Sequence, residues 1–582
     1  MKTTTFIALL ALIILLGLFI RLTDYGAYPY TGDTKAVLST AVMWFYEIPN
    51  FQVQLPEKTI TTNFPGLFDQ GEPPLGHMII GSGCMFSGED FSNIKQASPM
   101  YYPNRARLLG QQFTKAKPYC EAPIYLFGIL LFIILIILSY LLVKNHLAVL
   151  FSASFFAFYP LMQDFSRQMH VDIISWVFIA LSLIFIYMAY LEEKQTKKEY
   201  IYFTLTAVFL ALSLATKFSA GLMLILAMLI FILKYKKEII ELIKSIADKI
   251  NAKEQKAKLN ADLIKLMLTI IIVFGIIFLA PFQFSISNVF DTYAKFNSHN
   301  PGDSTAGIHI NIIKTLADTF LININILDLI LFIVSLYILY QIITKKEKTK
   351  SEIFILASWF IFIFGFLFAN AFHLTRIASP YLFIIPITMS LIFSGSYKPK
   401  INKKYLSIIL IICIIFAFTI AFNAKPDFQA KNPIICHFNE YGCQTSYSEE
   451  YGTEQLVKFM KENLQKGETA IGDLTETFYF QMLQNQAEQN YLFDIQFRQQ
   501  TGRAPNLIEK AFYFQPDSKK VRYVVLRKNN NDSDAETIRN SLNPVKTITY
   551  KNQKIYEIYD IGGVVAKMTE QQDENNSSNS GI

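Results

Sequence analysis

Residues 122–143 read APIYLFGILLFIILIILSYLLV, an apolar run without a charged side chain. About 20 apolar residues are enough for an α-helix to cross a bilayer. The run is typical of the whole chain, since 52% of its 582 residues are hydrophobic, 17% are charged and the mean hydropathy is +0.30. This composition excludes a soluble enzyme and predicts a polytopic membrane protein that is mainly α-helical.

Similar runs recur along the chain and predict about eleven transmembrane helices. The expected spans are 4–23, 122–143, 147–163, 173–191, 200–216, 218–233, 266–286, 320–343, 353–372, 379–396 and 405–423. No small-residue cleavage pattern precedes Arg21, so we expect the first span to be an uncleaved anchor.

Basic residues indicate the orientation of these spans. Alternate connections hold about 21 lysines, and the intervening short connections hold about 5 Lys and Arg. Short cytoplasmic loops retain Lys and Arg, so we expect a cytoplasmic N-terminus in the cell membrane, with residues 24–121 and the region from about 424 outside. The net charge of +7 is diffuse and does not indicate a nucleic-acid partner.

The predicted organisation has three parts. Residues 1–423 form the transmembrane domain, including a long outer loop at 24–121. Residues 424–564 form a small extracytoplasmic α/β domain, because strand and helix patterns alternate there. Its expected elements are helix 453–464, strand 469–472, helix 475–486, a strand near 491–495, strand 521–526, helix 534–541 and a hairpin at 546–559. Residues 565–582 are polar and predict a disordered tail.

The stretch 234–262 is rich in lysine, and its Ile and Leu residues recur at helical spacing. It predicts a cytoplasmic amphipathic helix on an anionic membrane surface, with a protein-docking role as the alternative.

The five cysteines agree with the predicted topology. Cys84 and Cys120 fall in the first outer loop, Cys436 and Cys443 fall in the C-terminal domain, and Cys413 lies within a span. Disulfides persist in oxidising compartments, so the four outer cysteines are disulfide candidates. Unpaired thiols remain the alternative, since spacing does not prove pairing.

Charged residues near the outer ends of spans are the candidates for chemistry, because ionisable groups at the rim of a membrane are costly. Asp33 follows the first span, and Gly32 with the helical pattern after it suggests a carboxylate at a helix N-terminus. A simple capping aspartate is the alternative for Asp33.

Two further segments carry candidate residues. In QGEPPLGHMIIG, residues 70–81, Glu72 and His77 flank a proline pair within reach of a shared ligand or metal. Glu72 serves either as a polar anchor or as a metal ligand, and His309 could complete a divalent-metal site. In FYPLMQDFSRQMHVD, residues 158–172, Arg167 and Asp172 lie where the third and fourth spans meet. An ion pair of Arg167 with Asp172 or Asp164 that only fixes this junction is the alternative.

The order of these features resembles that of the GT-C membrane glycosyltransferases of the protein O-mannosyltransferase and aminoarabinose-transferase type. The resemblance spans roughly residues 1–400. The features that carry it are Asp33 after the first span, the PPL motif at 73–75, Pro160, Ser166, Arg167 and Asp172, the ATKFSAG segment with Lys217, and Arg376 followed by Tyr381 and Pro386.

The resemblance implies a GT-C fold and a reaction. The enzyme would move a sugar from a polyprenyl-phosphate donor to a protein, lipid or glycan hydroxyl on the outer face. Asp33 matches the acid that activates or orients the acceptor, although Thr34 stands where many relatives have a second acid. The resemblance assigns Glu72, Arg167 and Asp172 to the acceptor and donor site. By topology, Lys217 and Arg376 are the cations best placed to hold the donor phosphate.

A transporter or flippase is the alternative function. Asp328, Asn323 and Asn325 lie within the eighth expected span and favour it, since polar groups in a span need partners. Against it, no inverted repeat is visible and the charged residues gather at the outer rim.

Overall fold

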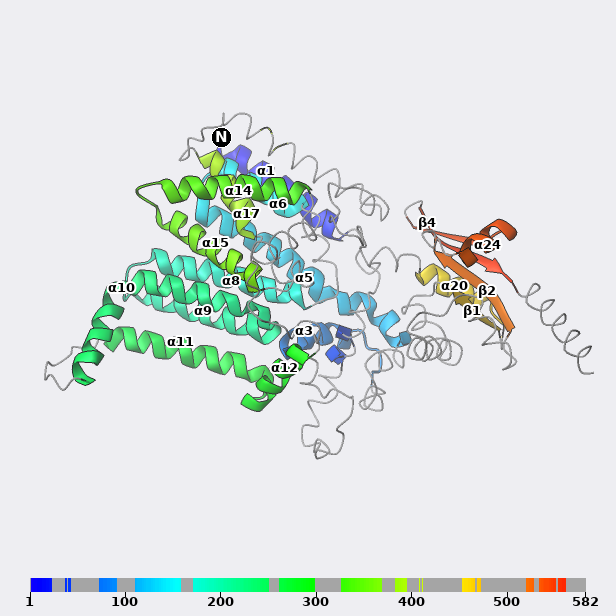
Figure 1. Ribbon diagram of the computed structural model, residues 1–582, viewed down its shortest axis with the longest axis horizontal. Helices are drawn as coiled ribbons and strands as arrows, with labels where there is room; N and C mark the ends of the chain where they lie inside the picture. The colour runs from blue at the N-terminus through cyan, green and yellow to red at the C-terminus, as the bar shows by residue number, and fades with distance from the viewer. Residues whose placement is uncertain are drawn as a thin grey trace, which may run out of the picture.

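The computed structural model describes the chain in sixteen segments. These are residues 2–22, 37–38, 40–42, 73–91, 110–158, 171–250, 261–298, 326–368, 383–394, 408, 411, 453–465, 468–472, 520–527, 533–550 and 553–561. The described residues form a large group of packed helices and a small four-stranded sheet (Figure 1).

The helical part contains twelve α-helices and three short 3-10 helices among the described residues. They are α1 Thr3–Leu22, α3 Pro74–Met85, α5 Gly110–Val143, α6 His146–Phe158, α8 Asp172–Leu191, α9 Lys197–Thr216, η3 Phe218–Gly221, α10 Leu222–Ile250, α11 Ala261–Leu279, η4 Ala280–Phe282, α12 Ile286–Ser298, α14 Ile326–Thr344, α15 Lys350–Phe368, α17 Ile384–Ser390 and η7 Leu391–Ser394.

Within this described part of the chain, five helical segments are long and apolar enough to cross a membrane. They are Thr3–Leu22, Lys115–Val143, Asp172–Leu191, Lys197–Thr216 and Asp262–Phe282. Three apolar helices are shorter, namely His146–Phe158, Phe332–Thr344 and Ile384–Phe393. The mainly α-helical membrane architecture is therefore present, and the number of eleven spans stays a prediction.

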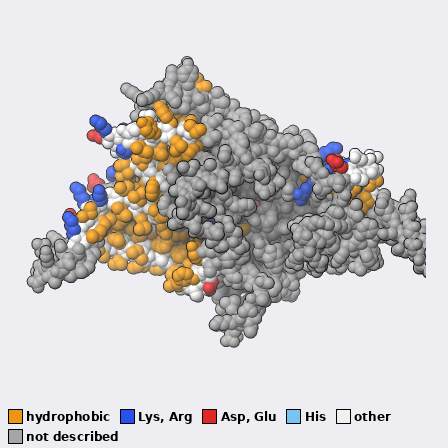
Figure 2. Space-filling model, in the orientation of Figure 1, with side chains coloured by type: hydrophobic (Ala, Val, Ile, Leu, Met, Phe, Trp, Pro, Cys, Tyr) orange, Lys and Arg blue, Asp and Glu red, His pale blue; other side chains and the backbone are white. Residues whose placement is uncertain are grey.

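Helix α8 is the centre of the bundle and α11 lies at its edge. In the apolar window of α8, 78% of the residues are buried, against 11% in that of α11. The indole of Trp176 and the ring of Tyr187 are among the largest fully buried side chains. In α11, Leu268, Ile271 and Ile272 are exposed, and Figure 2 shows how widely hydrophobic side chains cover this part of the surface. Such a surface is what a helix bundle presents to lipid.

Polar bonds between helices add specificity to the apolar packing. The hydroxyls of Ser175 in α8 and Ser213 in α9 lie 2.9 Å apart. The indole N–H of Trp359 donates to the hydroxyl of Thr388 at 2.9 Å, which joins α15 to α17. Small hydroxyl side chains allow close helix approach and satisfy each other where water is absent.

The bundle has two chemically different ends. The connections at Lys144, at 192–196 and at 345–349 lie at one end, which we call the basic end. The opposite end, here called the site end, contains the last residue of α1, the last of α6, the first of α8 and the last of α9. Two short elements, α3 and η3, pack at the site end.

The C-terminal sheet has the order β1-β2-β4-β3. Its strands are β1 Glu468–Gly472, β2 Lys520–Arg527, β3 Lys546–Tyr550 and β4 Gln553–Asp560. Strands β1 and β2 are parallel and the other pairs are antiparallel. Helix α20, Thr453–Asn463, packs on the face that contains Tyr523 and Val525, and α24, Ser533–Ser541, packs on the face that contains Val524 and Leu526. These bounds agree with the five corresponding predicted elements; the helix at 475–486 and the strand near 491–495 lie outside the described residues.

Candidate functional site

The structure describes five of the candidate site residues, of which His77 is buried in α3. Asp172 and Lys217 lie at the site end, Cys84 lies near the end of α3, and Cys120 lies in α5. The remaining candidates lie outside the described residues: Asp33, Glu72, Arg167, His309, Arg376, Cys436 and Cys443.

Asp172 and Lys217 form a buried ion pair. The Lys217 ammonium donates a hydrogen bond to Asp172 Oδ1, and the two side chains are 12% and 1% exposed. Asp172 is the first residue of α8, where the helix dipole favours a negative charge. The sequence suggests Arg167 as a partner of Asp172 and does not suggest Lys217, which lies 45 residues away along the chain.

The backbone around Lys217 explains why this lysine lies at the end of the bundle. Lys217 terminates α9 in an extended conformation, with φ −157° and ψ 127°. Its N–H donates to Ser213 O at 2.8 Å, and its own carbonyl accepts from the Ala220 N–H at 3.1 Å, which begins η3. The ATKFSAG segment is thus the break between α9 and α10. An extended residue between two helices directs its side chain across the end of α8 rather than along α9.

Helix α3 packs directly on this pair. Pro73 precedes the helix in an extended conformation and Pro74 is its first residue, so the proline pair starts the helix where an N–H is not needed. A Cβ on Gly76 would lie 2.7 Å from Val171 Cβ and 3.0 Å from Thr216 Cγ2. Val171 and Thr216 directly precede Asp172 and Lys217. A glycine is therefore required for α3 to reach the pair.

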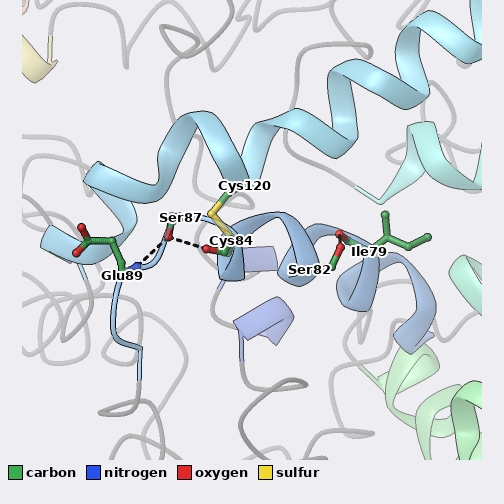
Figure 3. Close-up of a disulfide and its surroundings, with 6 residues drawn as sticks. All are labelled: Ile79, Ser82, Cys84, Ser87, Glu89 and Cys120. Atoms are coloured by element: carbon green, nitrogen blue, oxygen red, sulfur yellow. Dashed lines mark hydrogen bonds between the residues drawn. A yellow bond between two sulfur atoms is a disulfide. The ribbon is translucent and has the colours of Figure 1, made fainter.

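A disulfide fixes the other end of α3. Cys84, near the end of α3, is bonded to Cys120 of α5 (Figure 3). The Ser87 hydroxyl donates to the Cys84 carbonyl at 2.6 Å and accepts from the Glu89 N–H at 3.2 Å, which closes the turn after the helix. Helix α3 is thus held covalently at one end and by close packing at the other.

For the sugar transfer that the sequence resemblance implies, Gly76→Leu is expected to lower turnover by about 10²-fold, because α3 has to move away from the Asp172–Lys217 pair and small displacements in a site have effects of this size. The measurement is the transfer rate of the purified protein at saturating donor. The matched control is Gly275→Leu in α11, where nothing lies within 4 Å of an added Cβ. A Gly76→Leu protein that melts normally and transfers at the wild-type rate would contradict this packing argument.

Arg21 is a second residue at this end that the sequence analysis does not single out as functional. Its guanidinium is 3% exposed, donates to Phe156 O at 2.7 Å and Ala157 O at 3.3 Å, and lies over the Phe132 ring. These carbonyls are in the last turn of α6, so Arg21 joins the ends of α1 and α6. The available signal is a lone arginine near the end of an apolar span.

No cluster of three or more potential metal-ligating side chains occurs among the residues that the structure describes. Two of the proposed ligands, Glu72 and His309, lie outside them, and the third, His77, is buried in α3. A divalent metal therefore stays an expectation of the sequence.

Comparison with known proteins gives a family match. Residues 65–290 match the family of dolichyl-phosphate-mannose-protein mannosyltransferases. The matched range contains α3, the disulfide and the Asp172–Lys217 pair. No curated protein sequence matches the chain.

Three solved structures align with this chain. ArnT from Cupriavidus metallidurans bound to undecaprenyl phosphate aligns with 9% identity over 96% of this chain and 98% of its own, with a TM-score of 0.42. The Archaeoglobus fulgidus oligosaccharyltransferase tethered to an acceptor peptide aligns with 11% identity over 90% and 69%, with a TM-score of 0.43. The S. cerevisiae Pmt1-Pmt2 complex bound to the sugar donor aligns with 14% identity over 51% and 35%, with a TM-score of 0.31.

The family match covers the PPL motif, the junction at Asp172 and the ATKFSAG segment, which are features on which the predicted resemblance depends. The resemblance is confirmed: the protein is a membrane glycosyltransferase similar to the dolichyl-phosphate-mannose-protein mannosyltransferases.

Proposed function

We propose that the protein transfers a sugar from a polyprenyl-phosphate donor to a hydroxyl group of a protein, lipid or glycan, at the site end of the bundle and on the outer face of the membrane. The observation that carries this proposal is the buried Asp172–Lys217 pair, packed under α3 inside the range of the family match. A paired ion at the end of an apolar bundle is costly and marks a functional site by default.

The role of Lys217 follows from its contacts. An ammonium has three donors, and Asp172 Oδ1 is the acceptor that the structure gives it among the described residues. The remaining donors suit the oxygens of a phosphate that stays at the rim while its polyprenyl chain lies in lipid. Asp172 is too buried to meet an acceptor, so it acts as a positioning residue that holds the ammonium in place.

The other roles come from the resemblance. Asp33 accepts the proton of the acceptor hydroxyl while the sugar leaves the phosphate, and Arg376 joins Lys217 in stabilising the charge on that phosphate. Glu72 and Arg167 belong to the acceptor and donor site. In sequence, Glu72 directly precedes Pro73, the residue before the first residue of α3.

Two features support an outer location of the site. The Cys84–Cys120 disulfide lies at the site end, and disulfides persist in oxidising compartments. The lysine-rich connections lie at the opposite end, which is the cytoplasmic end by the positive-inside rule.

The test uses the full chain in lipid nanodiscs with radiolabelled polyprenyl-phosphate mannose and a mixture of hydroxyl-rich peptides, membrane lipids and glycans. We expect label to move from the organic phase to a product, and unlabelled polyprenyl phosphate to compete. A nucleotide-linked mannose supplied without the lipid donor should give no product. Transfer from the nucleotide sugar alone, or movement of the intact donor across a bilayer without transfer, would overturn the proposal, and the second result would support a flippase.

A further inference from the structure

Helix α10 changes its character at the basic end. Its first half is apolar, whereas the sequence after Tyr235 reads KKEIIELIKSIADKI. Tyr235 interrupts the helix with φ −106° and ψ 21°. Figure 1 shows that α10 bends at this end and that its last turns run across the ends of the neighbouring helices rather than along them.

A buried polar cluster fixes this bend. The Lys234 ammonium lies 2.8 Å from Glu199 Oε1 and donates to Glu192 O at 2.8 Å, and the Tyr235 hydroxyl donates to the same Glu199 oxygen at 2.6 Å. The side chains of Lys234 and Glu199 are 4% and 0% exposed. The cluster joins α10 to α9 and to the end of α8, so the second half of α10 leaves the bundle in a defined direction.

One further contact holds the helix beyond the bend. The Lys194 ammonium, in the connection between α8 and α9, is 2.5 Å from Glu238 Oε1. This pair turns one side of the helix toward the bundle and neutralises an acidic residue there.

The outward side of the same turns is amphipathic. Ile240 and Ile243 are 42% and 60% exposed, and they lie three residues apart, on one face of the helix. Lys236, Lys237 and Lys244 are exposed beside them. Glu241 is also exposed, so the described exposed side chains of residues 236–244 carry three positive charges and one negative charge.

Because the neighbouring helices cross the membrane, a helix that runs across their ends lies parallel to the membrane surface. We propose that residues 236–250 of α10 form a binding surface for anionic lipid headgroups at the basic end. The two isoleucines enter the boundary of the acyl chains, and the three lysines reach the headgroup phosphates. Other lysines gather at the same end, as Figure 2 shows at its left margin, and add to the attraction for an anionic surface.

Lipid fits this surface better than an acidic protein. Among the described side chains, the two exposed isoleucines are flanked by lysines, whose long stems can cover acyl chains while their ammonium groups reach the headgroup phosphates. The proposal does not depend on the transfer reaction, so it can fail or succeed separately from the proposed function.

The test is hydrogen exchange of the full chain in nanodiscs of phosphatidylcholine, with and without phosphatidylglycerol. We expect the amides of residues 236–250 to exchange at least about five-fold more slowly with phosphatidylglycerol, which is the factor that one lysine contributes beside an anionic surface. Raising the salt concentration should remove the difference. Lys236→Gln/Lys237→Gln/Lys244→Gln should also remove it, and glutamine keeps the helix propensity of lysine.

Two controls separate a surface effect from a general one. Lys458→Gln/Lys461→Gln/Lys546→Gln removes three exposed positive charges from the C-terminal domain and should keep the difference. Residues 222–233 should exchange equally slowly in every variant, which shows that α10 is folded. Equal exchange of residues 236–250 in the two lipids would overturn the proposal, as would full protection of the lysine variant. Ile240→Ala/Ile243→Ala, in which the helix is retained, should weaken the protection as well.

Discussion

Asp33→Asn is expected to lower sugar transfer by about 10²–10⁴-fold, the range that a general base contributes, while donor binding stays unchanged. An amide has the shape of the carboxylate but cannot accept the proton of the acceptor hydroxyl. In the proposed mechanism, donor affinity depends instead on the cations at the phosphate and on the polyprenyl chain in lipid. The reaction rate and the binding constant should therefore respond differently to the same substitution.

The measurement compares single-turnover transfer with the affinity for polyprenyl-phosphate mannose in nanodiscs. Asp24→Asn is the matched control, because it makes the same change nine residues earlier in the same segment, and we expect it to transfer normally. If Asp33→Asn binds donor and transfers at the wild-type rate, the assignment of the base is wrong while the glycosyltransferase class survives. Loss of donor binding would instead indicate a role in the donor site.

Lys217→Met is expected to destabilise the protein by about 3–5 kcal/mol, the usual effect of breaking a buried ion pair from one side. The reason is the environment of Asp172, whose side chain is 1% exposed and would lose the ammonium group that neutralises its charge. Asp172→Asn in the same protein removes that charge, so Asp172→Asn/Lys217→Met should recover most of the lost stability.

Transfer should not recover with stability in the double variant. A methionine cannot donate to the donor phosphate, so the affinity for the donor and the transfer rate should stay low in both Lys217 variants. Thermal unfolding in detergent and donor binding in nanodiscs give the two readouts. The control is Lys115→Met/Glu89→Gln, which removes a pair at 3.6 Å between an exposed lysine and a half-buried glutamate and should change stability by about 0–1 kcal/mol.

Two outcomes would contradict this view of the pair. An Asp172→Asn/Lys217→Met protein with normal donor binding would exclude Lys217 from the phosphate site. A Lys217→Met protein that melts at the wild-type temperature would show that Asp172 does not depend on Lys217 for its charge.

Local patterns predicted the elements of this protein well. A helix in lipid satisfies its own backbone groups, so an apolar run of sufficient length specifies its own structure without reference to the rest of the chain. The span expected at 173–191 is α8, Asp172–Leu191, and that expected at 4–23 is α1, Thr3–Leu22. The strands at 469–472 and 521–526 were predictable for a similar reason, since short runs of β-prone residues have few alternatives.

The contacts between elements could not be predicted from local sequence patterns. The expected span 218–233 and the basic stretch 234–262 suggested two separate elements, and α10, Leu222–Ile250, does consist of two helical parts that meet at a kink at Tyr235. What the sequence did not predict is the cause of this kink. The cause is the pair of Lys234 with Glu199 of α9, a contact between residues that are far apart in sequence. No local periodicity encodes such a partner.

The candidate site also has a part that the sequence predicts and a part that only the packing of the helices determines. Asp172, Lys217, Cys84 and Cys120 were recognisable from the sequence because a charge or a thiol in an apolar chain stands out within its own window. The partner of Asp172, and the need for glycine at position 76, follow from how α3, α8 and α9 meet at one end of the bundle. Hydropathy is a local property, because it depends on the transfer of each residue from water. An ion pair and a close helix approach depend instead on segments that are far apart in sequence, and these segments come together only when the helices pack.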